Sequence, residues 1–494
     1  MGCKTLLFGF DGLDHQRLDQ LIAEGVLPNF ERLRSQSQCV RMHNYPGLGA
    51  GAFWTSAATG DTPARHGRYF YLQFDPKTYD YKTFEQELAF HKPAFWETLD
   101  AEGKRVAVID WHRGPFNEMK NGILIDNWLA HDAASPPRMS PPSTADMVFG
   151  KYGHDPIAGG YANQKIATVE DHLNFAEGVR KRIGAKVRLS VDLLNEREWD
   201  LIAPCFSELH DLGHYYLQLT SEDHELFDPA LRESIGDPVR ACYIETDKAL
   251  GEIRQAAGDD AVIMMLGGPG IEPMISANSA MPEIALKLDI GAGAPPSGEA
   301  NARRAYQSYI PNAVRHRIAP LARRIRRLLA KNEYKSRRFF SVPHNDNAGC
   351  IRINLKGREK YGVVKPGAEA DALLEEIKEG LLSLKNADTG APAVAEVYFS
   401  RDVHAEQEGD LLPDIFVEWD RTHNRRNFRR LTSDRTGEIR VPAPVRNGDH
   451  TRHSVFWSTG PAHPIFTDGE THLPHEATAL ITESVTQAHR TKPA

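Results

Sequence analysis

The stretch Thr5-Leu-Leu-Phe-Gly-Phe-Asp11-Gly12 is an apolar run that ends in an acid and a glycine. Apolar runs of this length are typical of a central strand in a parallel sheet, where both faces are buried. Apolar residues then recur at roughly helical spacing from Leu18 to Leu33, which predicts one helix after this strand. Further candidate strands are residues 105–109, 201–206, 261–265, 351–355, 395–399 and 415–419. The alternation of strands and helices predicts an α/β fold with a doubly wound, mostly parallel sheet flanked by helices.

Three polar motifs follow the first strand. Gly47-Leu-Gly-Ala-Gly51 precedes Trp54-Thr-Ser-Ala-Ala-Thr59-Gly60, residues 201–206 lead into Ser-Glu208-Leu-His210-Asp211-Leu-Gly-His214, and Asn447-Gly-Asp-His450 comes last. In this order the motifs resemble the type I phosphodiesterase and nucleotide pyrophosphatase branch of the alkaline phosphatase superfamily. The resemblance covers about residues 4–460. It implies an alkaline-phosphatase-like fold with a two-metal site.

The chain departs from the family pattern at two places. The family has a Ser or Thr nucleophile nine residues before the Thr of the Thr-Gly pair, and here that position is Ala50. The family also places an Asp-His-Gly or a related motif after the strand that corresponds to residues 261–265. Here the sequence is Met265-Leu-Gly-Gly-Pro-Gly, so both ligands are missing.

The ligands that remain indicate one metal. Carried over residue by residue, the resemblance leaves only Asp11 at the first site, and His210, His214 and His450 at the second. Three imidazoles with an open fourth position are typical of catalytic zinc. We therefore expect one divalent metal, zinc, whose bound water has a pKa near 7 and replaces the missing hydroxyl as the nucleophile. The alternative is chance, because the chain has 21 histidines and a spacing of four fixes no geometry in a loop.

Three acids are candidate catalytic residues. Asp11 ends the first strand and could orient water or a substrate hydroxyl, or it could cap a helix or a turn. Glu208 and Asp211 flank His210, so either could be a general base or could fix the tautomer of a histidine. The alternative for both is an ordinary exposed acid in a loop.

Substrate contacts are expected from two other segments. Gly49, Ala50 and Gly51 precede a predicted helix, so their backbone N–H groups could face an anion. The spacing is not that of a dinucleotide or P-loop motif. His112 follows the strand at residues 105–109 and could line the cleft, because ligands of open α/β sheets lie at the carboxyl ends of strands.

These residues predict a divergent metal-dependent hydrolase or group-transfer enzyme that acts on a small anionic phospho-, phosphono- or sulfo-compound. One alternative is an inactive relative that serves as a binding or scaffold protein. Another is recruitment of the fold for other biosynthetic chemistry, and a further one is an engineered Ala50 in an active enzyme. The missing Asp-His motif argues against the last of these.

Length and patterning suggest one domain over residues 1–480, with a cap insertion at residues 288–340 and a frayed tail at 481–494. Residues 312–338 are strongly basic, with an apolar stripe, which suggests a helix that meets an anionic surface or a solvated helix beside the cleft.

A net charge of −8 argues against general nucleic-acid affinity. The five cysteines have no paired spacing, and neither a signal peptide nor a run of about 18 apolar residues is visible. We therefore expect a cytoplasmic protein with no membrane partner. The sequence specifies no oligomeric state.

Overall fold

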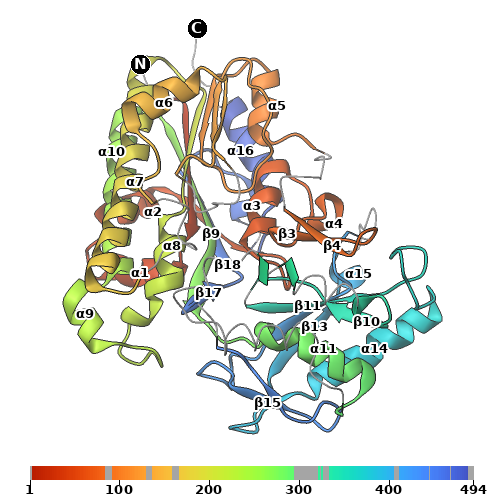
Figure 1. The fold of residues 1–494 in the computed structure, drawn as a ribbon. Helices are drawn as coiled ribbons and strands as arrows, with labels where there is room; N and C mark the ends of the chain where they lie inside the picture. The colour runs from red at the N-terminus through yellow and green to blue at the C-terminus, as the bar shows by residue number, and fades with distance from the viewer. Residues whose placement is uncertain are drawn as a thin grey trace.

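The computed structural model describes residues 3–83, 92–129, 136–157, 166–293, 321–322, 324–325, 333–345, 347–404, 411–443, 446–467 and 469–487. Within these residues, nine strands form the main sheet (Figure 1). Its centre is parallel, in the order β9 (Val262–Pro273), β1 (Thr5–Gly12), β8 (Leu201–Phe206), β5 (Val106–Ile109) and β6 (Ile123–Asp126). Antiparallel strands complete it: β2 (Gln38–His43), β18 (His453–Ser458), β17 (Gly448–His450) and β7 (Arg138–Ser140). The predicted mostly parallel sheet is confirmed.

Helices cover both faces of this sheet (Figure 1). One face packs against α1 (His15–Ala23), α2 (Pro28–Gln36), α6 (Thr144–Tyr152), α7 (Val169–Glu196), α8 (Glu208–Tyr216) and α10 (Pro238–Ala257). The other face packs against α3 (Ala50–Thr59), α5 (Phe95–Ala101) and α16 (Glu476–Gln487). Among the described residues, no helix has the length and apolar character needed to cross a bilayer.

The single helix predicted between Leu18 and Leu33 is wrong. The chain forms α1 and α2, with Pro28 in the first turn of α2. Proline lacks the N–H that a helix interior needs, so it starts a second helix instead of continuing the first. Gly25, between the two helices, has a φ of +73°, which an L-residue rarely adopts.

A second sheet lies beside the main one. It is antiparallel and contains β10 (Phe339–Ser341), β11 (Ala348–Ile353), β14 (Ile415–Trp419) and β13 (Val394–Phe399), in that order. Residues predicted as strands at 351–355, 395–399 and 415–419 join this sheet and not the parallel one. Its core includes residues of α11 (Met281–Ile290) and α14 (Ala368–Leu382).

Smaller elements complete the described structure. They are the pair β3 (Leu72–Asp75) and β4 (Asp80–Thr83), the sheet of β12 (Lys385–Asn386), β15 (Arg430–Thr432) and β16 (Ile439–Arg440), the short helices α4 (Pro63–His66), α9 (Pro229–Ile235) and α15 (Ser400–Val403), and the 3-10 turns η2 (Leu217–Leu219), η3 (Asn278–Ala280) and η4 (Pro464–Phe466).

The C-terminal segment differs from expectation. Residues 481–487, which we expected in a frayed tail, belong to α16, where Ile481 and Val485 are fully buried in the core shared with α3. Apolar residues at helical spacing give this segment a face to bury. Residues 488–494, and most of the residues expected to form the cap insertion and the basic helix, lie outside the described residues.

Candidate metal centre

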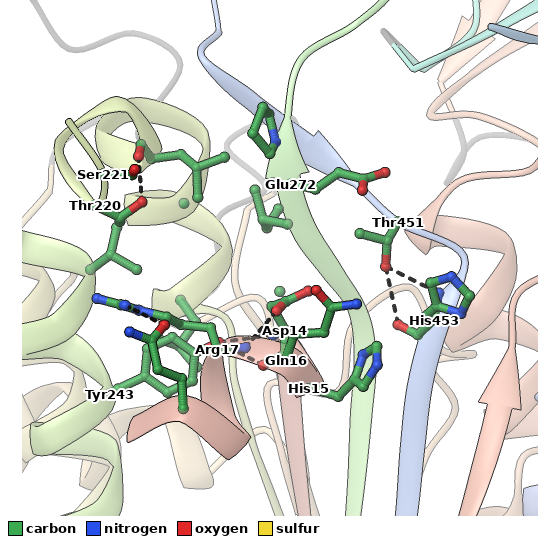
Figure 2. A pocket seen from close by; sticks show the side chains of 18 residues that line it. Asp14, His15, Gln16, Arg17, Thr220, Ser221, Tyr243, Glu272, Thr451 and His453 are labelled. Carbon is green, nitrogen blue, oxygen red and sulfur yellow. Dashed lines mark hydrogen bonds between the residues drawn. The ribbon is translucent and has the colours of Figure 1, made fainter. Parts of the chain in front are cut away.

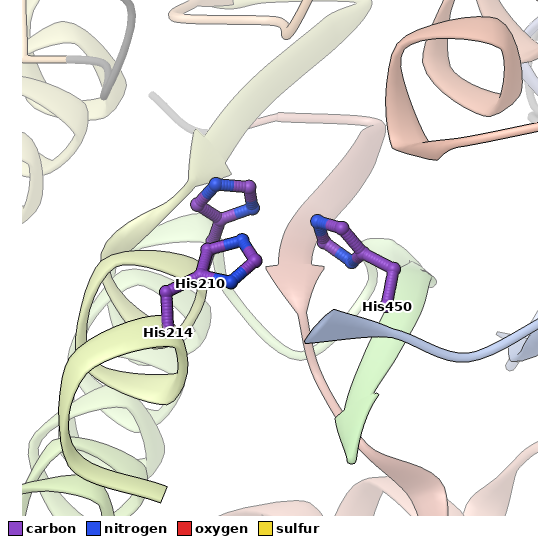
Figure 3. Close-up of side chains that lie close together, drawn as sticks. All are labelled: His210, His214 and His450. Carbon is purple, nitrogen blue, oxygen red and sulfur yellow. The ribbon is translucent and has the colours of Figure 1, made fainter. Parts of the chain in front are cut away.

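Three histidines lie together at the carboxyl edge of the main sheet (Figure 3). His210 and His214 are on α8, which starts two residues after β8 ends. Residues four apart on a helix share one face, so both rings project from the same side of α8. His450 is the last residue of β17 and pairs with Ile271 of β9. We expected His210 and His214 in a loop, whereas the helix gives them a defined geometry.

The ring nitrogens converge. The ligand atoms of the three histidines lie within 4.8 Å of one another. Nδ1 of His214 is 2.7 Å from the carbonyl oxygen of Gly448, and Nδ1 of His450 is 2.9 Å from that of Pro269. A carbonyl oxygen only accepts, so each of these Nδ1 atoms carries a proton and donates it. Nε2 of each ring therefore has the lone pair, which is the form that binds a metal.

Burial keeps these two rings neutral. Because burial disfavours the charged imidazolium, it lowers the pKa of His450 to about 4 and that of His214 well below its usual value. Both rings are therefore neutral at pH 7, as metal ligands must be. Nε2 of His450 is also buried without a hydrogen-bond partner among the described residues. A buried nitrogen without a partner, beside two other imidazoles, fits a divalent metal such as zinc.

Asp11, at the end of β1, lies behind His210. One carboxylate oxygen, Oδ2, is 3.1 Å from Nδ1 of His210, and the other, Oδ1, accepts a hydrogen bond from Nε1 of Trp54 at 2.9 Å. Burial alone would raise the pKa of Asp11, but His210, followed by His112 and His450, lowers it below its usual range. Asp11 is therefore a carboxylate. It does not cap α1, because the N-cap is Asp14, whose side chain accepts from the backbone N–H of Arg17.

The expected substrate segment lies at the start of α3. Gly49 is the N-cap, and Ala50 is the first helical residue and is buried. The amide of Asn345 occupies the space that a Cβ on Gly49 would take, whereas Gly51 leaves 3.9 Å between such a Cβ and the Arg113 side chain. Trp54 follows Ala50 by one turn, which places both on the face of α3 toward Asp11.

His112 follows β5 and is buried. It lies close enough to Asp11 to lower the pKa of that carboxyl group. The structure thus brings His112 into the same group of side chains as Asp11 and the three histidines.

Sequence comparison identifies the family. The profile of the type I phosphodiesterase / nucleotide pyrophosphatase family matches residues 5–423. The chain belongs to this family. A comparison with curated protein sequences finds no significant match.

Solved structures of phosphonoacetate hydrolase share the fold. Phosphonoacetate hydrolase from Sinorhizobium meliloti, in complex with phosphonoformate, has a TM-score of 0.53 and 13% identity, covering 98% of this chain and 96% of that one. Its complex with phosphonoacetate has a TM-score of 0.51, with the same identity and coverage. Human ectonucleotide pyrophosphatase / phosphodiesterase 5 has a TM-score of 0.47 and 13% identity, covering 98% of this chain and 95% of that one.

In this member of the phosphodiesterase family, Glu208 and Asp211 are not exposed loop acids. Both are fully buried on α8. Oε1 of Glu208 is 3.0 Å from Nζ of Lys186, and Oδ2 of Asp211 is 2.7 Å from Nη1 of Arg182, both fully buried cations of α7. Burial alone would lower the pKa of Lys186, but Glu208 and then Asp110 raise it, so the ammonium stays charged. Burial raises the pKa of Asp211 to about 6.

A cavity is lined in part by Gly12 and Gly213 (Figure 2). Its volume is about 390 Å³, and it is lined by acids such as Asp14 and Glu272 and by bases such as Arg17. None of the three clustered histidines lines it. Gly12 separates it from His210, because a Cβ on Gly12 would lie 2.6 Å from the backbone nitrogen of His210.

Trp54 opens a motif that assigned it no role, and Lys186 and Arg182 belong to no motif. Trp54 lies in an alanine-rich helix, where an aromatic residue is typical of the core. Arg182 and Lys186 were visible only as charges four apart on a helical face that also carries Val179 and Ile183. Buried cations on an apolar face need carboxylate partners. That requirement was the one indication in the sequence that Arg182 and Lys186 form ion pairs.

Proposed function

We propose that this chain is a hydrolase or group-transfer enzyme that uses one divalent metal, zinc, and acts on a small anionic phosphoester or phosphonate. The observation that carries the proposal is the convergence of His210, His214 and His450 within 4.8 Å, with at least two of the rings neutral at pH 7. An open three-histidine set is typical of catalytic rather than structural zinc.

The three histidines would hold the metal. When bound, such an ion supplies Lewis-acid charge and a water activated near neutral pH. The chain's own residues hold the ligands in place: Gly448 and Pro269 accept from Nδ1 of His214 and His450, and Asp11 faces Nδ1 of His210. The ion pairs that Glu208 and Asp211 form with α7 fix α8 itself.

Ala50 excludes the covalent route of the family at this position, because a methyl group cannot form a phosphoryl ester. We propose that water or an acceptor substrate attacks directly. The first turn of α3, with Gly49, Ala50 and Gly51, presents backbone N–H groups and the positive end of the helix dipole to an anion. His112 adds a polar side chain beside Asp11.

The complexes of phosphonoacetate hydrolase with phosphonoformate and phosphonoacetate support a small anionic substrate. At 13% identity these structures share only the fold with this chain, so they support the class of substrate and not a particular compound. All five cysteines are unpaired thiols, which fits a reducing compartment, and we propose a cytoplasmic location.

The test is metal content and turnover together. Protein purified without added metal is analysed for elements, then assayed with zinc against phosphodiesters, phosphomonoesters, phosphonates and sulfate esters. We expect a tightly bound divalent metal and turnover of a phosphorus substrate that a chelator abolishes and zinc restores. Metal-free protein that binds no added zinc would refute the proposal.

The second candidate is a non-catalytic binding protein. It is favoured by Ala50 and by the absence of ligand side chains at Gly267 and Gly268. Retention of bound metal without turnover of any substrate class in the same assays would support it.

A further inference from the structure

The indole of Trp54 fills the space on one side of the Asp11 carboxylate. Trp54 is fully buried, and its Nε1–H donates to Oδ1 of Asp11 at 2.9 Å. The ring packs edge-to-face against Trp111, at a centroid distance of 5.1 Å. The indole is thus held by the core, and its N–H group points at the acid.

Next to the indole and the carboxylate, β9 leaves no room for a side chain that could bind a metal. We expected residues 267–270 after the strand, but β9 continues through them to Pro273. A Cβ on Gly268 would lie 2.9 Å from Oδ1 of Asp11 and 2.9 Å from Cζ2 of Trp54. Cβ atoms essentially never approach another heavy atom this closely, so any side chain at Gly268 would displace the indole or the carboxylate.

The other oxygen of Asp11 faces His210. Oδ2 lies 3.1 Å from Nδ1 of that ring. A carboxylate beside Nδ1 holds the proton on that atom, so that Nε2 presents its lone pair to a metal. Oδ1 thus accepts a hydrogen bond from Trp54, and Oδ2 faces the ring of His210, so a group of this chain lies beside each oxygen of Asp11.

We propose that Trp54 is a positioning residue that makes Asp11 the orienting partner of His210 and not a ligand of a second metal. The inference rests on the proposed single-metal function and adds the reason why this site takes only one ion. The partial positive charge of the indole N–H stabilises the Asp11 carboxylate in the place where a second cation would otherwise stabilise it.

The experiment measures zinc affinity by competition with a chelator. Trp54→Phe keeps an aromatic ring and removes the N–H, so Asp11 is held less firmly. We expect zinc to bind roughly 10- to 100-fold more weakly, the range for loss of a partner behind a ligand. Trp111→Phe is the control, because its indole is buried next to Trp54 and donates to the Trp54 backbone carbonyl without contacting Asp11. It should bind zinc like the wild type.

A double mutant separates positioning from packing. If Trp54 acts through Asp11, Asp11→Asn combined with Trp54→Phe should bind zinc no more weakly than Asp11→Asn alone. Two independent, additive losses would mean that Trp54 acts only by packing and would overturn the inference. Wild-type affinity in Trp54→Phe would overturn it as well.

A second pair of variants keeps the test valid if Trp54→Phe does not fold. Gly268→Ala crowds Asp11 and Trp54, whereas a Cβ on neighbouring Gly267 approaches no atom closer than 3.3 Å. We expect Gly268→Ala to weaken zinc binding and Gly267→Ala to leave it near the wild-type value. Equal affinities in the two variants would contradict the inference, and so would two zinc ions per wild-type chain. A wild-type chain that binds no zinc would instead defeat the proposed function.

Discussion

Nδ1 of His214 donates to the carbonyl oxygen of Gly448 at 2.7 Å, two residues before His450. The backbone N–H of Asn447 in turn donates to the carbonyl oxygen of His214 at 2.9 Å. These bonds join α8 to β17 directly at the metal centre. The side chain that supplies one ligand therefore also positions the strand that supplies another.

His450→Ala should remove most bound metal. Loss of a ligand should weaken zinc binding by more than the roughly 100-fold that loss of an outer partner can cause. The matched control is His453→Ala, which removes an exposed histidine three residues later. Elemental analysis and chelator competition measure both. Equal metal content in the two variants would show that His450 is not a ligand.

Gly12→Ala should damage both stability and metal binding. Gly12 has a φ of +77°, and a Cβ there would lie 2.6 Å from the backbone nitrogen of His210. Gly25→Ala is the matched control, because Gly25 has a φ of +73° with no atom within 4 Å. We expect Gly25→Ala to cost about 1 kcal/mol from backbone strain alone.

Chemical denaturation measures both unfolding free energies, and zinc competition measures the effect at the site. Gly12→Ala should lose more unfolding free energy than Gly25→Ala, and only Gly12→Ala should bind zinc more weakly. Identical losses would mean that the close approach of β1 to α8 has no energetic consequence.

Transfer of a chiral phosphorus group to water should invert its configuration. Ala50 has no hydroxyl to take the group first, so a single displacement remains. Phosphorus NMR of an isotopically chiral thiophosphate ester would report the outcome. Retention would demand a different nucleophile in the chain and would contradict the proposed direct attack.

Ala50→Thr should not restore a covalent route. The new hydroxyl would lie one turn before Trp54, whose indole fills the space beside Asp11. No second cation would be there to lower the pKa of the hydroxyl. Mass spectrometry of the variant trapped during turnover should find no phosphoryl-enzyme. A large gain in phosphodiesterase activity would show that a second metal does bind.

Stability should fall as the pH drops from about 6.5 to 4. Burial lowers the pKa of His344 and of His404 to about 4, below the value of about 6.5 expected in the unfolded chain. Between these pH values the unfolded state binds more protons than the folded state, so the free energy of unfolding rises with pH. The stability that depends on these two histidines is fully present above about pH 6.5. Each histidine contributes roughly 3 kcal/mol at most to this change in the free energy of unfolding.

Urea midpoints measured from pH 4 to 8 check this. His404→Leu should flatten the dependence, because His404 is buried and leucine does not titrate. An unchanged slope in that variant would exclude His404 as a source of the acid sensitivity.

The central strands and the three histidines could be predicted because their patterns are local. The apolar run from Thr5 ends in the acid that faces the site, and His210, His214 and His450 lie in motifs whose order specifies a family. The helix that carries His210 was missed, although serine at position 207 favours a helix start, because α8 begins only two residues after β8 ends.

The remaining features depend on partners far apart in the chain. The residues of the second sheet were predicted as strands, but a strand pattern does not say which sheet each strand joins. Lys186 and Trp54 acquire their roles only when α7 meets α8 and α3 meets β1. A buried charge or a buried N–H is recognised by its partner, and the partner is set by the fold.

The placement of β17 and β18 has a consequence for how this protein is made. Both strands pair with β9, and β18 lies between β9 and the edge strand β2, so residues 448–458 complete a sheet whose other strands all come before residue 274. A chain emerging from the ribosome can pair β1 with β8 and carry two of the histidines long before His450 is synthesised. The three-histidine centre therefore forms only after residue 450 has been synthesised, and a chain that stops short of it holds an incomplete site.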